Sequence, residues 1–495
     1  MKRLLLLLFI LLISVEVSFA GSADKVLEKY KKATGGDVVK KLKTTLITGT
    51  AQKVGAVEQE AGSFSYTFSE PDKLLFELTT QQEKYRICFN GKSVWKEDSK
   101  GAKTVLGDEK KNFRLYSILL NSRLRDLSKY KISNKLAEKT TIENKDAVAV
   151  DFSLLDASTR IFFDVSSNLP INLQYQISDS TEEIVFSDYR KVEKTVEPFQ
   201  IRIKSSVGEY LLNVSEVNYN RSVDQKTFLF PQPEGQTLPD VEQLLTAVMA
   251  NQKQVQERRE FYTFRKTETT NQRDGKGEIK ETETNVYDVI PVSREFVEKL
   301  VIKNGKELSE SERKKEDKRV EKEIAEIRKE QQKRENNQKK KKKDDDDDER
   351  VNILAILQTS EVTSVRRENF RDHEVIAFDF EPRKSFKPKN RAENIINKLA
   401  GTFFVDEQAK QIVRLEAKFL DSFKIGGGLL ASISPNTAFV FEQEKIRDEI
   451  WLPSYAEINI SAKALLFVKF NQDTIFKYSD YKKYQTDVET KFDED

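Results

Sequence analysis

The chain has 495 residues, 38% of them hydrophobic, and its 84 Lys and Arg residues nearly balance its 82 Asp and Glu residues. This balance argues against a general attraction to nucleic acid or to an anionic membrane surface. The length suffices for two or three domains, and a single cysteine, Cys88, excludes an intramolecular disulfide.

Residues 1–20 have the pattern of a signal peptide. Lys2 and Arg3 precede an apolar run over residues 4–13, and Ser18-Phe19-Ala20 satisfies the small-x-small rule for cleavage. The apolar run is too short to cross a bilayer as a helix. We therefore expect a soluble, exported, periplasmic protein that is cleaved near Ala20.

The mature chain is expected to begin with one helix and one strand. Val26, Leu27 and Tyr30 lie on one face of an amphipathic helix over residues 23–34. Residues 44–51 are rich in β-branched side chains, which favours a strand.

Residues 62–95 hold three strand patterns. Apolar and polar residues alternate over 64–68, 74–78 and 85–89, with a turn at Glu70-Pro71-Asp72 and a type I′ hairpin expected at Asn90-Gly91. The alternation predicts an antiparallel meander with one apolar face. It also places Cys88 on the opposite face, where we expect exposure.

The later part of the first half predicts a helical segment followed by more strands. Apolar residues have helical spacing over 108–127. Strands are expected over residues 147–152, 160–165, 171–177, 184–189, 200–204 and 211–219. A further helix, capped by Asp240, is expected over 240–256.

Two groups of residues resemble the periplasmic outer-membrane lipoprotein carriers of the LolA/LolB type. One is the meander with its hairpin Asn90-Gly91-Lys92-Ser93-Val94-Trp95, and the other is residues 223–230 followed by Pro233-Glu234-Gly235. The resemblance covers residues 24–238. It implies an incomplete antiparallel β-barrel whose cavity holds acyl chains under a helical lid. In these carriers, an Arg immediately before the turn proline ties the barrel to the lid. The matching residue here is Glu70, so the resemblance does not tell which group would hold the lid in this protein.

Segments of the second half match the first half in the same order. Residues 294–306, 374–380, 401–419 and 451–453 parallel residues 83–92, 147–152, 159–176 and 197–199. We therefore expect a duplication and an α+β fold of two LolA-like incomplete antiparallel β-barrels, each a curved sheet covered by helices. The expected domains are residues 21–238, and residues 239–308 together with 350–495.

Residues 309–349 are predicted to be a charged insert, helical or disordered. Ser309 and Glu312 form a capping box, and Val320, Ile324 and Ile327 are its only apolar stripe. Five lysines and then five aspartates over 339–348 cannot bury apolar surface.

Residues with catalytic or metal-binding chemistry are sparse. The one histidine, His373, has no nucleophile motif beside it, and a single His with a single Cys argues against zinc. Residues 344–348 lack the ligand order of a calcium loop, and residues 426–428 lack the Lys of a phosphate loop. We therefore expect no enzyme, no metal and no cofactor.

The remaining candidate site is an apolar concave face. Its expected ligand-binding residues are Phe64, Tyr66, Phe68, Leu74, Phe76, Leu78, Tyr85, Ile87, Phe89, Val150, Phe152, Ile161, Phe163, Leu173 and Tyr175, with Leu115, Ile118 and Leu119 in the lid. An ordinary packed core would use the same residues.

Two functions fit these expectations. The first is a non-enzymatic carrier or binder of an acylated lipoprotein or lipid, acting in outer-membrane lipoprotein sorting and exchanging cargo with inner- or outer-membrane components. The alternative is a periplasmic sensor or scaffold, resembling RseB, that binds a protein partner. Neither function involves nucleic acid.

Overall fold

The computed structural model describes most of the chain between residues 22 and 483. The described range excludes residues 56–61, 82, 155–156, 178–179, 206–207, 233–234, 236, 274–278, 294, 339–352, 426–430, 435–436, 448 and 465–467. The expected signal peptide, the charge blocks at 339–348 and the glycines at 426–428 therefore lie outside the described residues.

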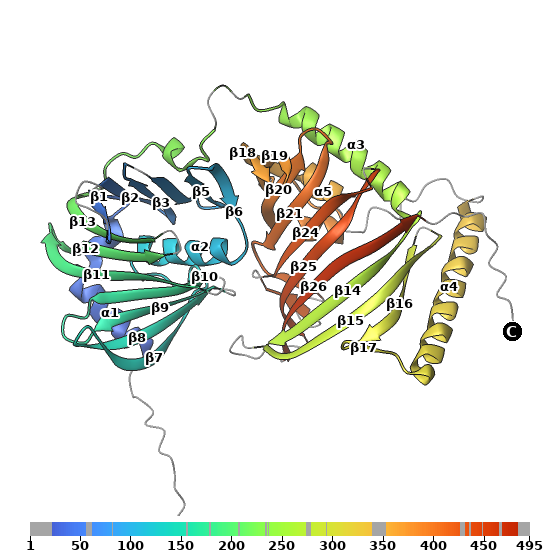
Figure 1. The fold of residues 1–495 in the computed structure, drawn as a ribbon, viewed down its shortest axis with the longest axis horizontal. Coiled ribbons are helices and arrows are strands. Elements are labelled where there is room, and N and C mark those ends of the chain that lie inside the picture. The colour runs from blue at the N-terminus through green and yellow to red at the C-terminus, as the bar shows by residue number, and fades with distance from the viewer. Residues whose placement is uncertain are drawn as a thin grey trace, which may run out of the picture. The chain divides into compact units, whose positions relative to one another are not determined.

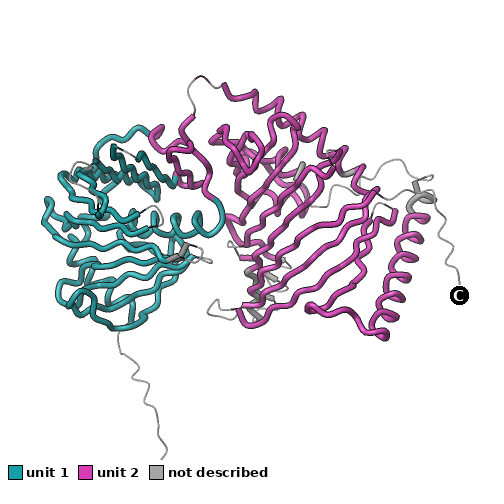
Figure 2. The backbone as a smooth tube through the Cα atoms, viewed as in Figure 1, with its two compact units in different colours: residues 1–89, 106–224 teal, residues 90–105, 225–495 magenta. Residues whose placement is uncertain are grey.

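The chain divides into two compact units (Figure 2). Unit 1 consists of Met1–Phe89 and Leu106–Asp224, and unit 2 of Asn90–Val105 and Gln225–Asp495. Residues 90–105 and 225–238, expected in the first domain, fall in unit 2 by this division, and the expected domain boundaries stay a prediction.

Unit 1 is built on one antiparallel sheet (Figure 1). Its strands follow the order β4-β3-β2-β1-β13-β12-β11-β10-β9-β8-β7, so the described strands of this sheet do not close into a barrel. They are β1 (Thr44–Lys53), β2 (Gly62–Ser69), β3 (Lys73–Thr79), β4 (Lys84–Phe89), β7 (Ser133–Ile142), β8 (Lys145–Leu154), β9 (Ala157–Asp164), β10 (Pro170–Ile177), β11 (Ser180–Val192), β12 (Thr195–Ser205) and β13 (Gly208–Tyr219).

The helices of unit 1 are α1 (Ala23–Ala33), the short 3-10 helix η1 (Gly36–Lys41) and α2 (Gly107–Asn121). Ser22 caps α1 by accepting a hydrogen bond from the Lys25 amide, and the helix buries Leu27 and Tyr30 as its periodicity predicts. The Tyr30 ring lies 5.7 Å from the Phe163 ring of β9. Helix α2 contacts β3, β9 and β10, so it lies over the sheet where the predicted lid was expected.

Strand register places the predicted apolar residues of the meander on one face. Residues directly opposite each other in an antiparallel pair share a face. The pairs are Phe64 with Leu78, Tyr66 with Phe76, Phe68 with Leu74, Phe76 with Ile87, Leu78 with Tyr85 and Leu74 with Phe89.

Cys88 is buried, and the expectation that it is exposed is wrong. The residue is 0% exposed, and its cross-strand neighbour Leu75 is 1% exposed. Both faces of β3 and β4 are therefore covered at this point, whereas simple alternation assumes that one face meets solvent. Burial raises the pKa of the Cys88 thiol well above its ordinary value.

The turn at Asn90-Gly91 is not type I′. That turn needs two successive residues with positive φ, and only Gly91, with φ 93°, has one here. Instead, the Asn90 side-chain oxygen accepts hydrogen bonds from the amides of Lys92 (2.9 Å) and Ser93 (2.8 Å). The side chain of Asn90 thus stabilises a longer turn.

Unit 2 also contains a large antiparallel sheet (Figure 1). Its main order is β17-β16-β15-β14-β26-β25-β24-β21-β20-β19-β18, with the short strands β22 and β23 beside β25. The strands are β14 (Tyr262–Arg273), β15 (Ile279–Val292), β16 (Glu295–Lys303), β17 (Lys306–Glu307), β18 (Ser360–Phe370), β19 (His373–Pro382), β20 (Leu399–Asp406), β21 (Gln411–Phe419), β22 (Phe423–Ile425), β23 (Ala431–Ile433), β24 (Ala438–Ile446), β25 (Ile450–Ala464) and β26 (Val468–Lys483).

The helices of unit 2 include the 3-10 helix η3 (Gln225–Phe228), α3 (Val241–Arg259), α4 (Glu310–Gln338), α5 (Ile353–Thr359) and α6 (Arg391–Ile396). Helix α3, capped by Asp240 as expected, packs Leu244 and Val248 into a core with Phe378 and Phe403. Helix α4 begins at the expected capping box, where Glu312 accepts a hydrogen bond from the Ser309 amide at 2.9 Å.

The hairpin of β5 (Val94–Asp98) and β6 (Gly101–Val105) is held in unit 2 by buried polar contacts. Trp95 Nε1 donates to the Phe228 carbonyl at 3.0 Å. The Thr104 amide and hydroxyl donate to Glu368 of β18 at 2.5 and 2.6 Å.

The two units share a pattern of strand order. In each, the first strand lies between the second and the last strand, β1 between β2 and β13, and β14 between β15 and β26. Of the four matched segment pairs, three fall at equivalent places, on β8 and β19, on β9–β10 and β20–β21, and on β12 and β25. The fourth pair falls on β4 and β16. Because β4 is three strands from β1 whereas β16 is two strands from β14, these two strands are not at equivalent places. The shared order supports the expected duplication, which stays a prediction.

Candidate ligand-binding pocket

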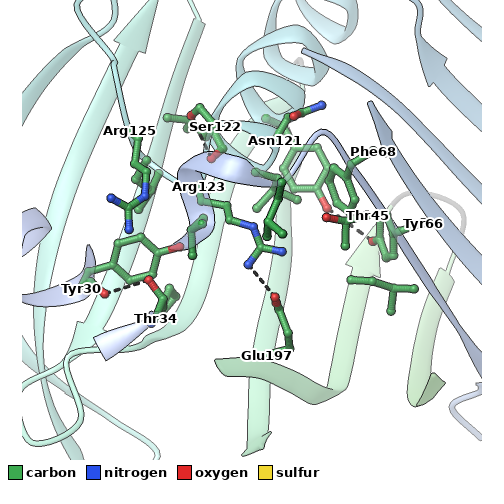
Figure 3. Close-up of a pocket in the computed structure, with 18 of the residues that line it drawn as sticks. Tyr30, Thr34, Thr45, Tyr66, Phe68, Asn121, Ser122, Arg123, Arg125 and Glu197 are labelled. Atoms are coloured by element: carbon green, nitrogen blue, oxygen red, sulfur yellow. Dashed lines mark hydrogen bonds and ion pairs between the residues drawn. The ribbon is translucent and has the colours of Figure 1, made fainter. Parts of the chain in front are cut away.

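Unit 1 contains a pocket of about 620 Å³ (Figure 3). Its walls come from α1, η1, β1, β2, the end of α2 with the segment that follows it, and β9 to β12. Its apolar lining includes Val39, Leu42, Ile47, Tyr66, Phe68, Leu119, Leu120, Leu124, Ile161, Leu173, Phe186, Val196 and Ile201.

One pair of facing strand residues and two aromatic residues of β2 contribute to the apolar part of the pocket. Ile161 on β9 and Leu173 on β10 lie directly opposite each other, and they are 2% and 0% exposed. On β2, the Tyr66 ring stacks on Phe68 and lies 4.6 Å from the Phe76 ring. Strand alternation turns these side chains to the same side as α2.

Tyr66 links the sheet to α2. Its hydroxyl lies 3.4 Å from the hydroxyl of Tyr116, which is also buried. Burial raises the pKa of Tyr66 to about 12, although the Tyr116 hydrogen bond lowers it. Burial also raises the pKa of Tyr116. Both phenols are therefore neutral at physiological pH.

The end of α2 is tied to the turn between β2 and β3. Asn121 donates from its side-chain amide to the carbonyls of Ser69 at 2.9 Å and Lys73 at 2.7 Å. The Tyr130 hydroxyl donates to the Pro71 carbonyl at 2.8 Å. These contacts hold α2 over the pocket through groups other than Glu70.

Two arginines follow α2 and enter the pocket wall (Figure 3). Arg123 pairs with Glu197 of β12 at 2.6 Å, and both side chains are largely buried. Burial by itself would lower the pKa of Arg123, but the Glu197 carboxylate, with Tyr30 and Tyr219, more than offsets this and raises it. Arg125 donates to the carbonyls of Lys31 (3.3 Å) and Gly36 (2.7 Å).

Five of the predicted site residues line this pocket. They are Tyr66, Phe68, Ile161, Leu173 and the lid residue Leu119. The other predicted residues are buried or half-buried around it: Phe64, Leu74, Phe76, Leu78, Tyr85, Ile87, Phe89, Val150, Phe152, Phe163, Tyr175, Leu115 and Ile118. Their contact with a ligand stays a prediction.

Sequence reasoning missed the polar part of the pocket. Arg123, Arg125 and Glu197 carry no motif, and two of them lie in an irregular segment where Arg123 and Leu124 have positive φ. The alternation of β11 and β12 could have identified Phe186 and Ile201, since both strands were expected. The charged residues could not be assigned without knowing which strands face α2.

No group of three or more His, Cys, Asp or Glu side chains within the described residues is placed to hold a metal ion. None of the helices described is long and apolar enough to cross a membrane.

Comparisons with known proteins return structures of the expected family. No family model and no curated protein sequence matches the chain. Among solved structures, the chain is similar to a LolA superfamily protein from Nitrosomonas europaea, with 12% identity over 42% of this chain and 98% of that chain and a TM-score of 0.29.

Two further solved structures are similar to the chain. A DUF1329 family protein from Desulfovibrio piger has 12% identity over 41% of this chain and 96% of that chain, with a TM-score of 0.28. The MucA/MucB complex of Pseudomonas aeruginosa has a chain with 7% identity, covering 93% of this chain and 99% of that chain, with a TM-score of 0.19. Because every TM-score here is below 0.5, the proposals below rest on the residues of this chain.

Proposed function

We propose that unit 1 binds the acyl chain of a lipid or of an acylated protein in its pocket, without catalysis. The observation that carries this is the pocket itself, of about 620 Å³, whose lining includes the buried Ile161 and Leu173 and the C-terminal part of α2. Small-molecule sites have volumes of roughly 300–1,000 Å³ and mostly apolar linings. The motif resemblance to lipoprotein carriers supports the same assignment, and with it an exported carrier or binder in lipoprotein sorting.

The volume favours one acyl chain over several. A methylene group is similar in size to a water molecule, whose share of liquid volume is ~30 Å³. A pocket of about 620 Å³ then suits roughly 20 such groups. Burial of each methylene contributes about 0.8 kcal/mol, so a chain of about 14 carbons would contribute on the order of 10 kcal/mol before the cost of ordering.

Filling the pocket tests the proposal. Ile161→Trp places a large ring where the acyl chain would lie, and we expect it to weaken binding of a fluorescent fatty acid at least tenfold. Val165→Trp is the matched control, because Val165 is 51% exposed and does not line the pocket. Native mass spectrometry of protein purified from its own cells should show acyl adducts on the wild type.

Two outcomes would contradict the proposal. One is a wild-type protein that takes up no fatty acid and carries no adduct. The other is an Ile161→Trp variant that binds as the wild type does while remaining folded, because the acyl chain would then lie elsewhere.

The surface of α4 favours a second candidate function, that of a sensor or scaffold with a protein partner. The helix packs on unit 2 through Val320, Ile324 and Ile327, and the rest of its described surface is charged and exposed. A charged helix of this length offers a surface for such a partner.

Deleting the insert would expose Val292 and Val297, which α4 covers. Charge reversal at exposed Lys314, Lys318 and Lys322 is therefore the sharper test. A sensor should lose the protein that the wild type captures from cell-envelope extract and keep its fatty acid binding. An unchanged set of captured proteins would count against this candidate.

A further inference from the structure

One cation of the pocket has no anionic partner among the described residues. Arg125 is 7% exposed, yet no described carboxylate forms an ion pair with it. Its guanidinium donates to the carbonyls of Lys31 and Gly36, and its Nε is buried without a hydrogen-bond partner. A buried guanidinium normally has an anionic or fully hydrogen-bonded environment, because desolvating a charge is costly.

Three acidic residues around Arg125 are already paired with other cations. Glu28 of α1 lies 2.9 Å from Lys31, and Asp37 of η1 lies 2.9 Å from Lys40. Glu197 is paired with Arg123. Asp126, the next residue in the chain, is exposed and forms no ion pair with Arg125 among the described residues. The buried guanidinium can therefore accept an anionic partner from a ligand.

The pocket as a whole carries more positive than negative charge. Its lining includes the basic residues Lys40, Lys43, Arg123, Arg125 and Lys129, and the acidic residues Glu70, Asp126 and Glu197. Five positive and three negative side chains line the pocket, and Asp37 outside the lining pairs with Lys40, so an excess of one positive charge remains. An anion entering the pocket would therefore be attracted before it reached Arg125.

We infer that the ligand is an amphiphile whose anionic headgroup, a carboxylate or a phosphate, binds the guanidinium of Arg125 while its chain lies on Ile161 and Leu173. This rests on the proposed function, because it assigns the polar end of the same pocket. Guanidinium groups bind carboxylate and phosphate with two parallel hydrogen bonds, and such charge-assisted bonds are stronger than neutral ones. Neutral lipids would leave Arg125 without an anionic partner.

The test compares headgroups on one chain length. Palmitate, hexadecyl phosphate and hexadecanol displace a fluorescent fatty acid from the full-length protein, and inorganic phosphate is a fourth probe. We expect palmitate or hexadecyl phosphate to bind about ten- to a hundredfold more tightly than hexadecanol. Arg125→Gln should abolish that difference and leave hexadecanol binding unchanged.

Lys41→Gln is the matched control, since it removes one positive charge from an exposed residue of η1 that does not line the pocket. It should retain the headgroup preference. An equal loss of preference in Lys41→Gln, or a retained preference in Arg125→Gln, would overturn the inference and leave acyl binding intact. If neither palmitate nor hexadecanol binds, the proposed function fails as well. Tight binding of inorganic phosphate alone would assign the site to a free anion.

A second measurement covers the case in which Arg125→Gln does not fold. In wild-type protein labelled with ¹⁵N-arginine, the Nε–H resonance of Arg125 should shift with palmitate and not with hexadecanol. Equal shifts with both probes would contradict the headgroup contact.

Discussion

Arg123 Nη1 lies 2.6 Å from Glu197 Oε1 and joins the segment after α2 to β12 inside unit 1. Glu197 also accepts a hydrogen bond from the Tyr219 hydroxyl at 2.5 Å, and the Tyr219 hydroxyl contacts Thr195 at 2.5 Å. The carriers that the sequence resembles have an Arg before the turn proline, where this chain has Glu70. The position of the charged pair is therefore different here. The arginine follows α2, and its carboxylate partner belongs to the sheet.

Removing one partner of this pair should destabilise unit 1. Glu197→Gln leaves Arg123 charged and buried without a carboxylate, and breaking a buried pair costs about 3 kcal/mol or more. Urea unfolding of the full-length chain measures the loss. Asp151→Asn, which breaks the exposed pair with Arg160, is the control and should cost much less. Similar losses in the two variants would contradict a buried role for Glu197.

The raised pKa of Tyr66 predicts how the free energy of unfolding changes at alkaline pH. Its folded pKa is raised from 10.0 to about 12, so the folded state keeps its proton where the unfolded state loses it. The stabilisation is complete below about pH 10 and is lost as pH rises towards about 12. Tyr66→Phe should show a shallower fall of the unfolding free energy across this window, while an identical fall in both proteins would contradict the prediction.

Val320 should anchor α4 to the sheet of unit 2. It is 6% exposed and packs on Val292 and Val297. Val320→Ala keeps helix propensity but removes buried methyl groups, and the resulting cavity costs about 1 kcal/mol or more. Limited proteolysis should cut α4 faster in this variant. Glu321→Ala, at the neighbouring exposed position, is the control, and equal cutting rates would argue that α4 is held elsewhere.

We expect Arg366 to stabilise the β5–β6 hairpin. It is 1% exposed, lies 3.3 Å from Glu368 and 3.2 Å from Asp379, and donates to Thr104. Arg366→Met leaves two buried carboxylates without a cation, which should cost about 3 kcal/mol or more. The Thr104 amide should then exchange its hydrogen faster. Arg371→Met, at a 51% exposed side chain, should leave this exchange rate unchanged.

The sequence by itself determined the local elements of this protein. Alternation at period two predicted the strands of the meander and of β8 to β13, because one face of each strand had to be apolar. Helical spacing and caps predicted α1, α2 and α3, and the capping box at Ser309 predicted the start of α4. These signals depend on residues a few positions apart, so they can be read without the fold.

Only the tertiary structure decided the rest, because it depends on which segments far apart in the chain meet. Burial of Cys88 requires that the second face of β3 and β4 be covered, and assignment of the β5–β6 hairpin to unit 2 depends on Glu368, more than 250 residues away. In the pocket, Arg125, which follows α2, donates to the carbonyl of Lys31 near the end of α1. Glu197 of β12 forms its ion pair with Arg123 and not with Arg125. Contacts between residues so far apart in the sequence leave no periodic pattern along the chain, so they could not be predicted from it.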